Sequence, residues 1–337
     1  MTAPEPRANA ELVGHGAAEL ALLEAARSGR LHHAWLIVGP AGVGKATLAY
    51  RFARRLLAGL PAEGEGLALD PKHPVFRRVA AGSHADLHTI ERSADARTGR
   101  LHREILVDDV RAGAEFLRLT AAEGGWRVVV VDPAEALNAN AANALLKLLE
   151  EPPARAVLLL VCSAPGRLPA TLRSRCRKLR LAPLGEAGMQ TVLARRLPDL
   201  PAEERARLIA LAEGSPGRAL RLAAEEGVAI AALVDEVLAA VPGYGTARAH
   251  GLVDRLGRGE SGFATFMELL LSAIAAAVRA GARGHADPGQ QRLLAFRPLD
   301  AWGEVWHALS GLADETERLN LDRRQAVISG LALLDGA

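Results

Sequence analysis

A glycine-rich segment that ends in lysine lies near the start of the chain and could bind phosphate. It reads GPAGVGK over residues 39–45. Glycines at this spacing let backbone N–H groups face an anion, and the lysine reaches the outer phosphates of a nucleotide. A glycine turn with an incidental lysine is the alternative, but the apolar run before the segment and the helical pattern after it favour a phosphate loop. The residues expected to bind nucleotide are Gly39, Gly42, Gly44 and Lys45.

The residue after the lysine determines whether such a loop can position a metal ion. A serine or threonine hydroxyl at position 46 would normally bind Mg²⁺, but this chain has Ala46, with Thr47 one step later. One residue along a helix is a rotation of about 100°, so Thr47 does not simply take that place. We therefore expect ATP to bind weakly or not at all, with Thr47 among the residues of a degenerate nucleotide site and Mg²⁺ present only with nucleotide.

An acidic motif after a run of β-branched residues shows a second departure. Residues 127–131 end at Asp132, where NTPases carry the aspartate on the Mg²⁺ side. In ATPases of the AAA+ kind a glutamate comes next and polarises the attacking water, but here it is Pro133, which has no acid–base function. Glu135 is a weak substitute because general-base geometry is exacting. The losses at positions 46 and 133 together predict a phosphate-loop fold without efficient hydrolysis.

These residues need a scaffold in which parallel strands alternate with helices. Residues 35–38, 127–131 and 157–162 are short apolar runs typical of buried parallel strands, and 178–181 is a last short strand. Amphipathic helical patterns lie between them, and the helix over 136–151 stops at two prolines. This alternation over about 180 residues predicts an α/β fold, a doubly wound parallel sheet.

The composition changes after Pro183, and nearly all later segments have helical patterns. Short helices within 185–196, 202–212 and 217–226 suggest a small lid domain. The run 263–280 is the most apolar helix and is expected to be buried in a bundle or against partners. We predict a phosphate-loop domain over 1–183, a helical lid domain over 184–227 and a C-terminal helical domain over 228–337.

The overall composition excludes several classes of protein. The 337 residues contain 41 Lys and Arg against 39 Asp and Glu, a formal net charge of +2, so a nucleic-acid contact requires a local basic face. Aromatic residues make up 4%, which argues against an aromatic platform for single strands. The apolar run 269–278 is about half of the roughly 20 residues that cross a bilayer, so no membrane contact is expected.

Cysteine usage restricts the compartment and the metal chemistry. Cys162 and Cys176 are the two cysteines, so a disulfide framework and a four-cysteine zinc site are excluded. The polar start of the chain has no signal-peptide pattern, which predicts a cytoplasmic location.

Several motifs resemble those of the AAA+ clamp-loader subunits of DNA polymerase III, and the resemblance covers most of the chain. The motifs are GRLHHA at 29–34, AEGGW at 122–126, NALLKLLEEPP at 143–153, LVCS at 160–163, LRSRC at 172–176 and LNLDRRQ at 319–325. Motor subunits of that family would carry Ser or Thr at position 46 and Glu at position 133. Degenerate ATPase motifs joined to an intact Ser-Arg-Cys are typical of its delta-prime branch.

The resemblance implies roles for three residues outside the phosphate loop. Arg175 of the Ser-Arg-Cys motif would be an arginine finger that reaches the ATP of a neighbouring motor subunit. On composition alone, an exposed charged segment is the usual interpretation, and the motif reverses that preference. Ser163 would lie at the sensor position beside the phosphates, or cap a turn at the end of its strand. Arg218 would contact nucleotide from the lid, or lie on an exposed helix face.

The resemblance also implies partners and one missing module. Other subunits of a hetero-pentameric ring (motor subunits of the tau/gamma type and delta) would be the main partners, with the C-terminal helices forming a collar. The sliding clamp and primer–template DNA would be reached through that assembly, as part of a DNA-directed DNA polymerase holoenzyme. Many delta-prime subunits carry a zinc module between the first helix and the second strand. Here that interval contains His73 but no cysteine, and with His84 and His88 the spacing does not suit zinc, so no metal is expected.

Two other functions remain as alternatives. An active AAA+ clamp-loader ATPase of the motor type would need a displaced hydroxyl and a displaced base to compensate for Ala46 and Pro133. A phosphate-loop kinase for a small substrate would leave the Ser-Arg-Cys segment and the helical second half without a role.

Overall fold

Five parallel strands form the sheet of the first half of the chain, in a computed structural model that describes residues 5–60, 66–95, 97–123, 125–256 and 260–336. The strand order is β2-β3-β4-β1-β5. The strands are β1 (Ala34–Val38), β2 (Leu87–Ile90), β3 (Arg127–Val131), β4 (Ala156–Cys162) and β5 (Arg177–Arg180). The predicted α/β class with a doubly wound parallel sheet is confirmed. Because all five strands run in the same direction, their C-terminal ends lie together at one side of the sheet, called the carboxyl edge, and their N-terminal ends lie together at the opposite side, called the amino edge.

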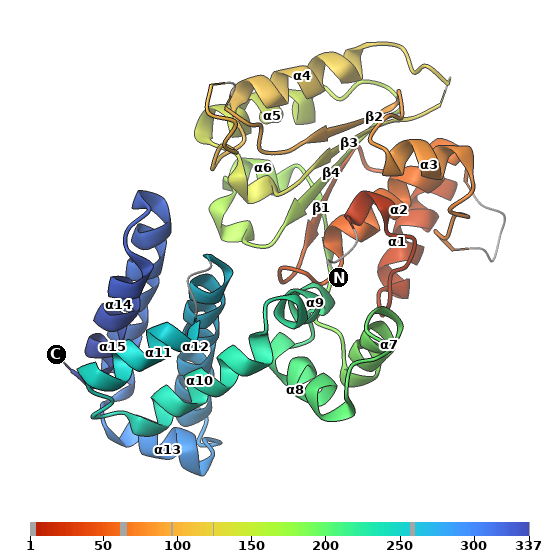
Figure 1. Ribbon diagram of the computed structural model, residues 1–337. Helices are drawn as coiled ribbons and strands as arrows, with labels where there is room; N and C mark the ends of the chain where they lie inside the picture. The colour runs from red at the N-terminus through yellow and green to blue at the C-terminus, as the bar shows by residue number, and fades with distance from the viewer. Residues whose placement is uncertain (1–4, 61–65, 96, 124, 257–259, 337) are drawn as a thin grey trace. The chain divides into compact units, whose positions relative to one another are not determined.

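Helices cover both faces of this sheet (Figure 1). One face carries α1 (Gly16–Arg27), α2 (Lys45–Ala58) and α3 (Pro74–Ala80). The other carries α4 (Val107–Arg118), α5 (Ala139–Glu150) and α6 (Ala170–Ser174). Short 3-10 turns η1 (Pro6–Ala8), η2 (Ala134–Ala136) and η3 (Pro165–Arg167) precede α1, α5 and α6, and α7 (Glu186–Arg196) follows the last strand.

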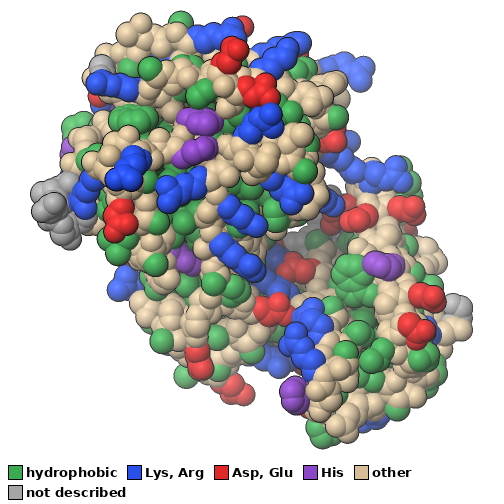
Figure 2. Space-filling view, turned by 180° about the vertical axis from the view of Figure 1, so that it is seen from behind, with side chains coloured by type: hydrophobic (Ala, Val, Ile, Leu, Met, Phe, Trp, Pro, Cys, Tyr) green, Lys and Arg blue, Asp and Glu red, His purple; other side chains and the backbone are tan. Residues whose placement is uncertain are grey.

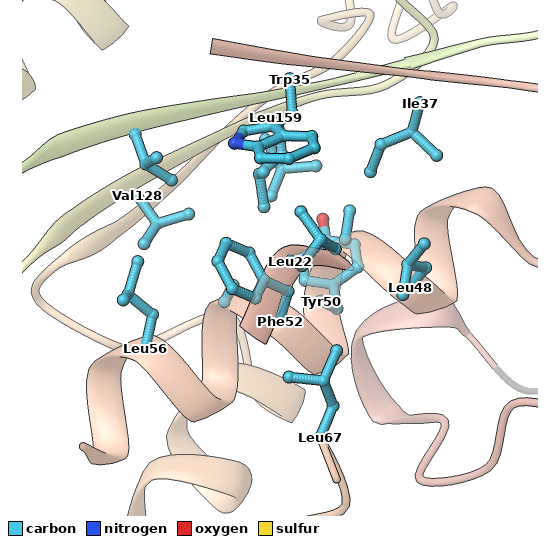
Figure 3. Packing of buried hydrophobic residues seen from close by; sticks show 14 of the residues in the cluster. Leu22, Trp35, Ile37, Leu48, Tyr50, Phe52, Leu56, Leu67, Val128 and Leu159 are labelled. Carbon is cyan, nitrogen blue, oxygen red and sulfur yellow. The ribbon is translucent and has the colours of Figure 1, made fainter. Parts of the chain in front are cut away.

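The core on the α2 face explains why this helix is fixed in place (Figure 3). Leu48, Phe52 and Leu56 recur at helical spacing and are almost fully buried against the sheet. Trp35 of β1 and Leu22 of α1 pack into the same cluster. Because α2 begins at Lys45, this packing also fixes the end of the glycine-rich loop.

The second half of the chain is helical, as predicted. Its helices are α8 (Ala202–Ala212), α9 (Pro216–Ala224), α10 (Gly227–Ala240), α11 (Thr246–Leu256), α12 (Glu260–Ala282), α13 (Pro288–Ala295), α14 (Leu299–Leu319) and α15 (Arg323–Asp335). Near its end, the Asp335 carboxylate accepts backbone N–H bonds from Gly243, Tyr244 and Gly245 at 2.9–3.2 Å. These bonds tie the end of α15 to the connection between α10 and α11.

The chain divides into two compact units. One unit contains the residues through Asp199 together with Ala212–Arg218, and the other contains Leu200–Leu211 together with the residues from Ala219 onward. The predicted three-domain division at residues 183 and 227 stays a prediction.

Helix α12 is longer than the apolar run 269–278 on which the prediction of no membrane span depended. Its stretch Gly262–Ala282 is long and apolar enough to cross a membrane by length and composition. The sequence prediction considered only residues 269–278 between two charged residues, but the helix continues through both charges. Of the most apolar part of this stretch, 44% is buried inside the protein. Helix α12 packs against α10 and α14. Core helices of water-soluble proteins pass the same length and composition test.

Candidate functional site

The glycine-rich loop leaves the carboxyl edge of β1 with a backbone that only glycine adopts readily. Gly42 and Gly44 have φ values of +73° and +109°, in the region that disfavours residues with a Cβ atom. A Cβ atom on Gly39 would lie 2.5 Å from the carbonyl oxygen of Leu181, so a side chain does not fit there. The loop leads directly into the N-terminus of α2 at Lys45. This strand, loop and helix have the context expected of a phosphate loop.

The N-terminal segment supports the base of this loop. His15 lies within hydrogen-bond distance of the Val43 carbonyl oxygen, with its Nε2 atom 2.9 Å away. The buried Arg54 guanidinium of α2 donates to the carbonyl oxygens of Arg7 and Asn9 at 2.8 and 2.6 Å, and it lies 4.2 Å from the centre of the Phe76 ring. The segment around Arg7 and Asn9 is thereby attached to the helix that follows the loop.

Lys45 lies inside the site, where it contacts groups of this chain. It is 5% exposed, and its Nζ donates to the Pro40 carbonyl oxygen at 2.6 Å and to Ser163 Oγ at 2.9 Å. Burial lowers the pKa of Lys45, while the nearby carboxylates of Glu135 and Asp132 act in the opposite direction. Lys45, Asp132 and Ser163, predicted from separate motifs, therefore meet at the carboxyl edge.

Two carboxyl groups lie beside this lysine. Burial raises the pKa of Asp132 to about 6, although Lys45 acts to lower it. Glu135 Oε1 accepts the backbone N–H of Ser163 at 2.9 Å, so Glu135 fixes the end of β4. Sequence reasoning considered Glu135 only as a displaced base and missed this contact, because the partner lies 28 residues away.

The donor set suits phosphate better than a metal ion. The glycine loop and Lys45 fit a nucleotide phosphate, because they offer a helix N-terminus and a buried ammonium group. Position 46 supplies no side-chain oxygen, and Thr47 is buried in the first turn of α2. Over the described ranges, no group of three or more His, Cys, Asp or Glu is arranged to hold a metal ion. These residues do not fit Mg²⁺ in its usual place.

The histidines considered for zinc have structural roles. His73 caps α3 by accepting the Val75 N–H, and His84 accepts the Asp86 N–H through its Nδ1. His88 stacks on the Phe116 ring, with the ring centres 5.4 Å apart.

A segment from the start of α9, residues 214–218, lies directly on the glycine loop. Ser215 Oγ donates to the Ala41 carbonyl oxygen at 2.7 Å, and the Gly217 N–H donates to the Gly42 carbonyl oxygen at 2.9 Å. A Cβ atom on Gly217 would lie 2.8 Å from the Cα of Gly42, so this backbone contact requires glycine. Sequence reasoning singled out Arg218 and missed Ser215 and Gly217, although a serine followed by proline is a helix-start signal.

The backbone of Arg218 is connected to the glycine loop through Ser215. Its N–H donates to Ser215 Oγ at 3.2 Å, and its side chain, 16% exposed, pairs with Glu213 at 3.7 Å. The role of Arg218 toward nucleotide stays a prediction.

Arg175 lies at the opposite edge of the same sheet. Strands β1 and β5 run in parallel, with Trp35 paired to Arg177 and Val38 paired to Arg180. Arg175 therefore precedes β5 at the amino edge, whereas the glycine loop follows β1 at the carboxyl edge. At about 3.3 Å per residue along the strands, Arg175 and the glycine loop are roughly 15–20 Å apart, which is farther than an arginine side chain reaches.

The surface charge is mixed. Figure 2 shows Lys and Arg side chains spread over one face of the molecule, with Asp and Glu between them. This agrees with the near balance of 41 basic and 39 acidic residues.

Comparison with known proteins identifies related sequences. The family described as "DNA polymerase III, delta subunit" matches residues 15–185, just over half of the chain. DNA polymerase III subunit delta' of Pseudomonas aeruginosa is 44% identical over 190 residues, which are 56% of this chain and 55% of that protein. The delta' subunit of Escherichia coli is 38% identical over 201 residues, 60% of this chain and 57% of that protein. This chain thus spans somewhat more than half the length of these two curated relatives.

More distant similarity extends to subunits of another type. DNA polymerase III subunit tau/gamma of Haemophilus influenzae is 33% identical over 216 residues, 63% of this chain and 29% of that protein. A solved structure of a gamma subunit-related protein from Thermotoga maritima is 16% identical, with a TM-score of 0.45 over 93% of this chain and 98% of that one.

Proposed function

The chain belongs to the delta-prime subunit family of DNA polymerase III, and from that premise we propose that it is a clamp-loader subunit without efficient ATPase activity. In this proposal it helps to load the sliding clamp on primed DNA, and it donates Arg175 to the nucleotide site of a neighbouring motor subunit. It acts in the cytoplasm as a component of the polymerase holoenzyme and is not itself the polymerase.

The position of Arg175 carries this proposal. The residue lies at the amino edge of the sheet, roughly 15–20 Å from the glycine loop of its own chain. An arginine finger at this place therefore acts on nucleotide held by another chain. Its guanidinium would stabilise the charge that develops on the γ-phosphate, an effect worth roughly 10³–10⁵ in rate in well-studied NTPases.

The chemistry of its own site supports the other half of the proposal. Ala46 offers no hydroxyl to Mg²⁺, and Pro133 stands where a catalytic glutamate is needed. Glu135 accepts the Ser163 N–H with its Oε1 atom, and this contact supports a structural role for the residue rather than that of a displaced base. Nucleotide would be held through the loop amides and Lys45 when it binds, and efficient hydrolysis is not expected.

The relatives suggest the partners. Similarity to both delta' and tau/gamma subunits supports a place in a hetero-pentameric ring with motor subunits of the tau/gamma type and delta. The C-terminal helices after residue 228 would form the collar that joins the subunits. Clamp and primer–template DNA would be contacted within the assembly.

The direct test of the ATPase claim is steady-state hydrolysis by the purified chain, with nucleotide binding measured in the same preparation. We expect turnover at background level whether or not ATP binds. Vigorous turnover by the chain alone would instead support the active motor-type ATPase, with a displaced hydroxyl and base.

The collar claim has its own test. A chain that ends near residue 228 should no longer join the other subunits in gel filtration. Incorporation of the shortened chain would contradict the proposed collar.

A further inference from the structure

The guanidinium of Arg175 is held from two sides. Arg175 follows α6 directly, and its Nη1 donates back to the Thr171 carbonyl oxygen of that helix at 3.0 Å. Its Nη2 lies 2.9 Å from Glu150 Oε1. Two contacts from different elements restrict the rotation of a side chain that is 39% exposed. The remaining N–H groups of the planar fork are still available to an anion.

Positive charges surround this arginine. Residues 173–180 also contain Arg173, Arg177, Lys178 and Arg180, and Arg177 lies over the Trp35 ring at 4.8 Å. Like charges at this density push an arginine side chain outward, and an acidic partner offsets that repulsion. Glu150 provides the acidic group that pairs with Arg175.

Glu150 belongs to a rigid element. It is the last residue of α5, whose apolar face (Leu145, Leu148 and Leu149) is buried against the sheet. The other end of α5 is fixed by Asn138, which accepts the Ala141 N–H at 2.9 Å. The helix spans roughly 18 Å, from the connection after Asp132 to the amino edge. The partial negative charge at its C-terminus adds to the attraction for a cation.

From these contacts we infer that Glu150 is the positioning residue of Arg175: it holds the guanidinium in the orientation from which it reaches the phosphates bound by the neighbouring subunit. This inference rests on the proposed function, because it assigns a partner to the proposed finger. Glu150 touches no nucleotide itself and acts through Arg175 alone.

The test uses the reconstituted loader and substitutions that alter only charge. Glu150→Gln should lower kcat of the DNA-stimulated ATPase by about three- to tenfold, with KM for ATP unchanged. The loss of a partly exposed, charge-assisted hydrogen bond changes the population of the oriented side chain by about that factor. Glu150→Lys should lower it further by adding another repelling charge. Glu151 is the next residue, exposed and of the same charge, so Glu151→Gln and Glu151→Lys are matched controls that should keep parental kcat.

Coupling to Arg175 separates positioning from a general structural effect. The double variant E150Q/R175A should be no slower than R175A, because Glu150 has nothing to position once the finger is removed. Additive losses in the double variant, parental kcat for E150Q, or a higher kcat for E150Q would each overturn the inference. Equal incorporation into the loader and equal thermal unfolding of E150Q and the parent chain should accompany the kinetic loss.

The same series distinguishes the two claims. If R175A lowers kcat strongly while E150Q and E150K behave like the parent, the positioning role fails and the finger stands. If R175A itself keeps parental kcat, the proposed function fails first.

Discussion

Replacing Ser215 with alanine perturbs the contact between the start of α9 and the glycine loop. Ser215 is 4% exposed, and its hydroxyl has two functions: it donates to the Ala41 carbonyl oxygen and accepts the N–H of Arg218. Loss of a helix cap costs about 1 kcal/mol, and loss of a hydrogen bond to a backbone carbonyl costs about 0.5–1.5 kcal/mol. The sum of roughly 2 kcal/mol corresponds to about a 30-fold increase in local opening.

The Gly217 amide reports that opening directly, because its N–H donates to Gly42 across the contact. Hydrogen exchange at this amide should accelerate by about 10- to 50-fold in Ser215→Ala, while amides in the core strands keep their protection. Ser28→Ala is the control, since that hydroxyl donates to the Ala25 carbonyl oxygen at the end of α1 and touches no part of the loop. Unchanged exchange at Gly217 in Ser215→Ala would refute the argument that Ser215 holds the two segments together.

Three further substitutions test charged groups that are partly or fully buried. Burial raises the pKa of Asp132 to about 6, so its ionised form destabilises the fold above that pH, and the penalty is relieved as the pH falls toward 4. Asp132→Asn should therefore stabilise the chain by about 1–3 kcal/mol above about pH 7, with the gain shrinking below pH 6 in urea titrations. Burial acts to raise the pKa of Asp335, but the hydrogen bonds from Gly243, Gly245 and Tyr244 outweigh it and the pKa is lowered. That stabilisation is present above about pH 4 and is lost as the pH falls through the lowered pKa. Because solvent screens this partly exposed carboxylate, Asp335→Asn should cost only about 0.5–1.5 kcal/mol in thermal unfolding near neutral pH and little in strong acid; a constant difference would contradict it. Arg54→Ala should release the segment around Arg7 and Asn9 from α2, with a loss of about 2–4 kcal/mol in the free energy of unfolding and faster proteolysis in that segment; parental resistance would show that the segment is held by other contacts.

Local patterns predicted the parts of the site that are contiguous in sequence. The glycine loop, the run that ends at Asp132 and the strand before Ser163 each follow from neighbouring residues, because turn geometry and burial act over a few positions. Strand β2 was missed because it is an outer strand, paired on one side only, and only Ile90 in it is fully buried. It therefore lacks a continuous apolar run.

Contacts between distant segments could not be predicted in the same way. Ser215 and Gly217 meet the loop across about 175 positions, and the sequence shows only a helix start there. The bond between Glu135 and the Ser163 amide depends on the order of β3 and β4 in the sheet, which no local pattern contains. The pairing of Glu150 with Arg175 likewise depends on α5 and α6 packing side by side.

The central claim is that Arg175 acts on nucleotide bound by another chain. The most direct measurement is single-turnover ATP hydrolysis by motor subunits in a loader reconstituted with Arg175→Ala, compared with the parent chain and with Arg173→Ala as the neighbouring arginine control. We expect normal assembly, unchanged ATP binding by the motor subunits, and a loss of at least about 100-fold in hydrolysis at the site next to this chain for Arg175→Ala alone. Parental hydrolysis at that site in the Arg175→Ala loader would contradict it.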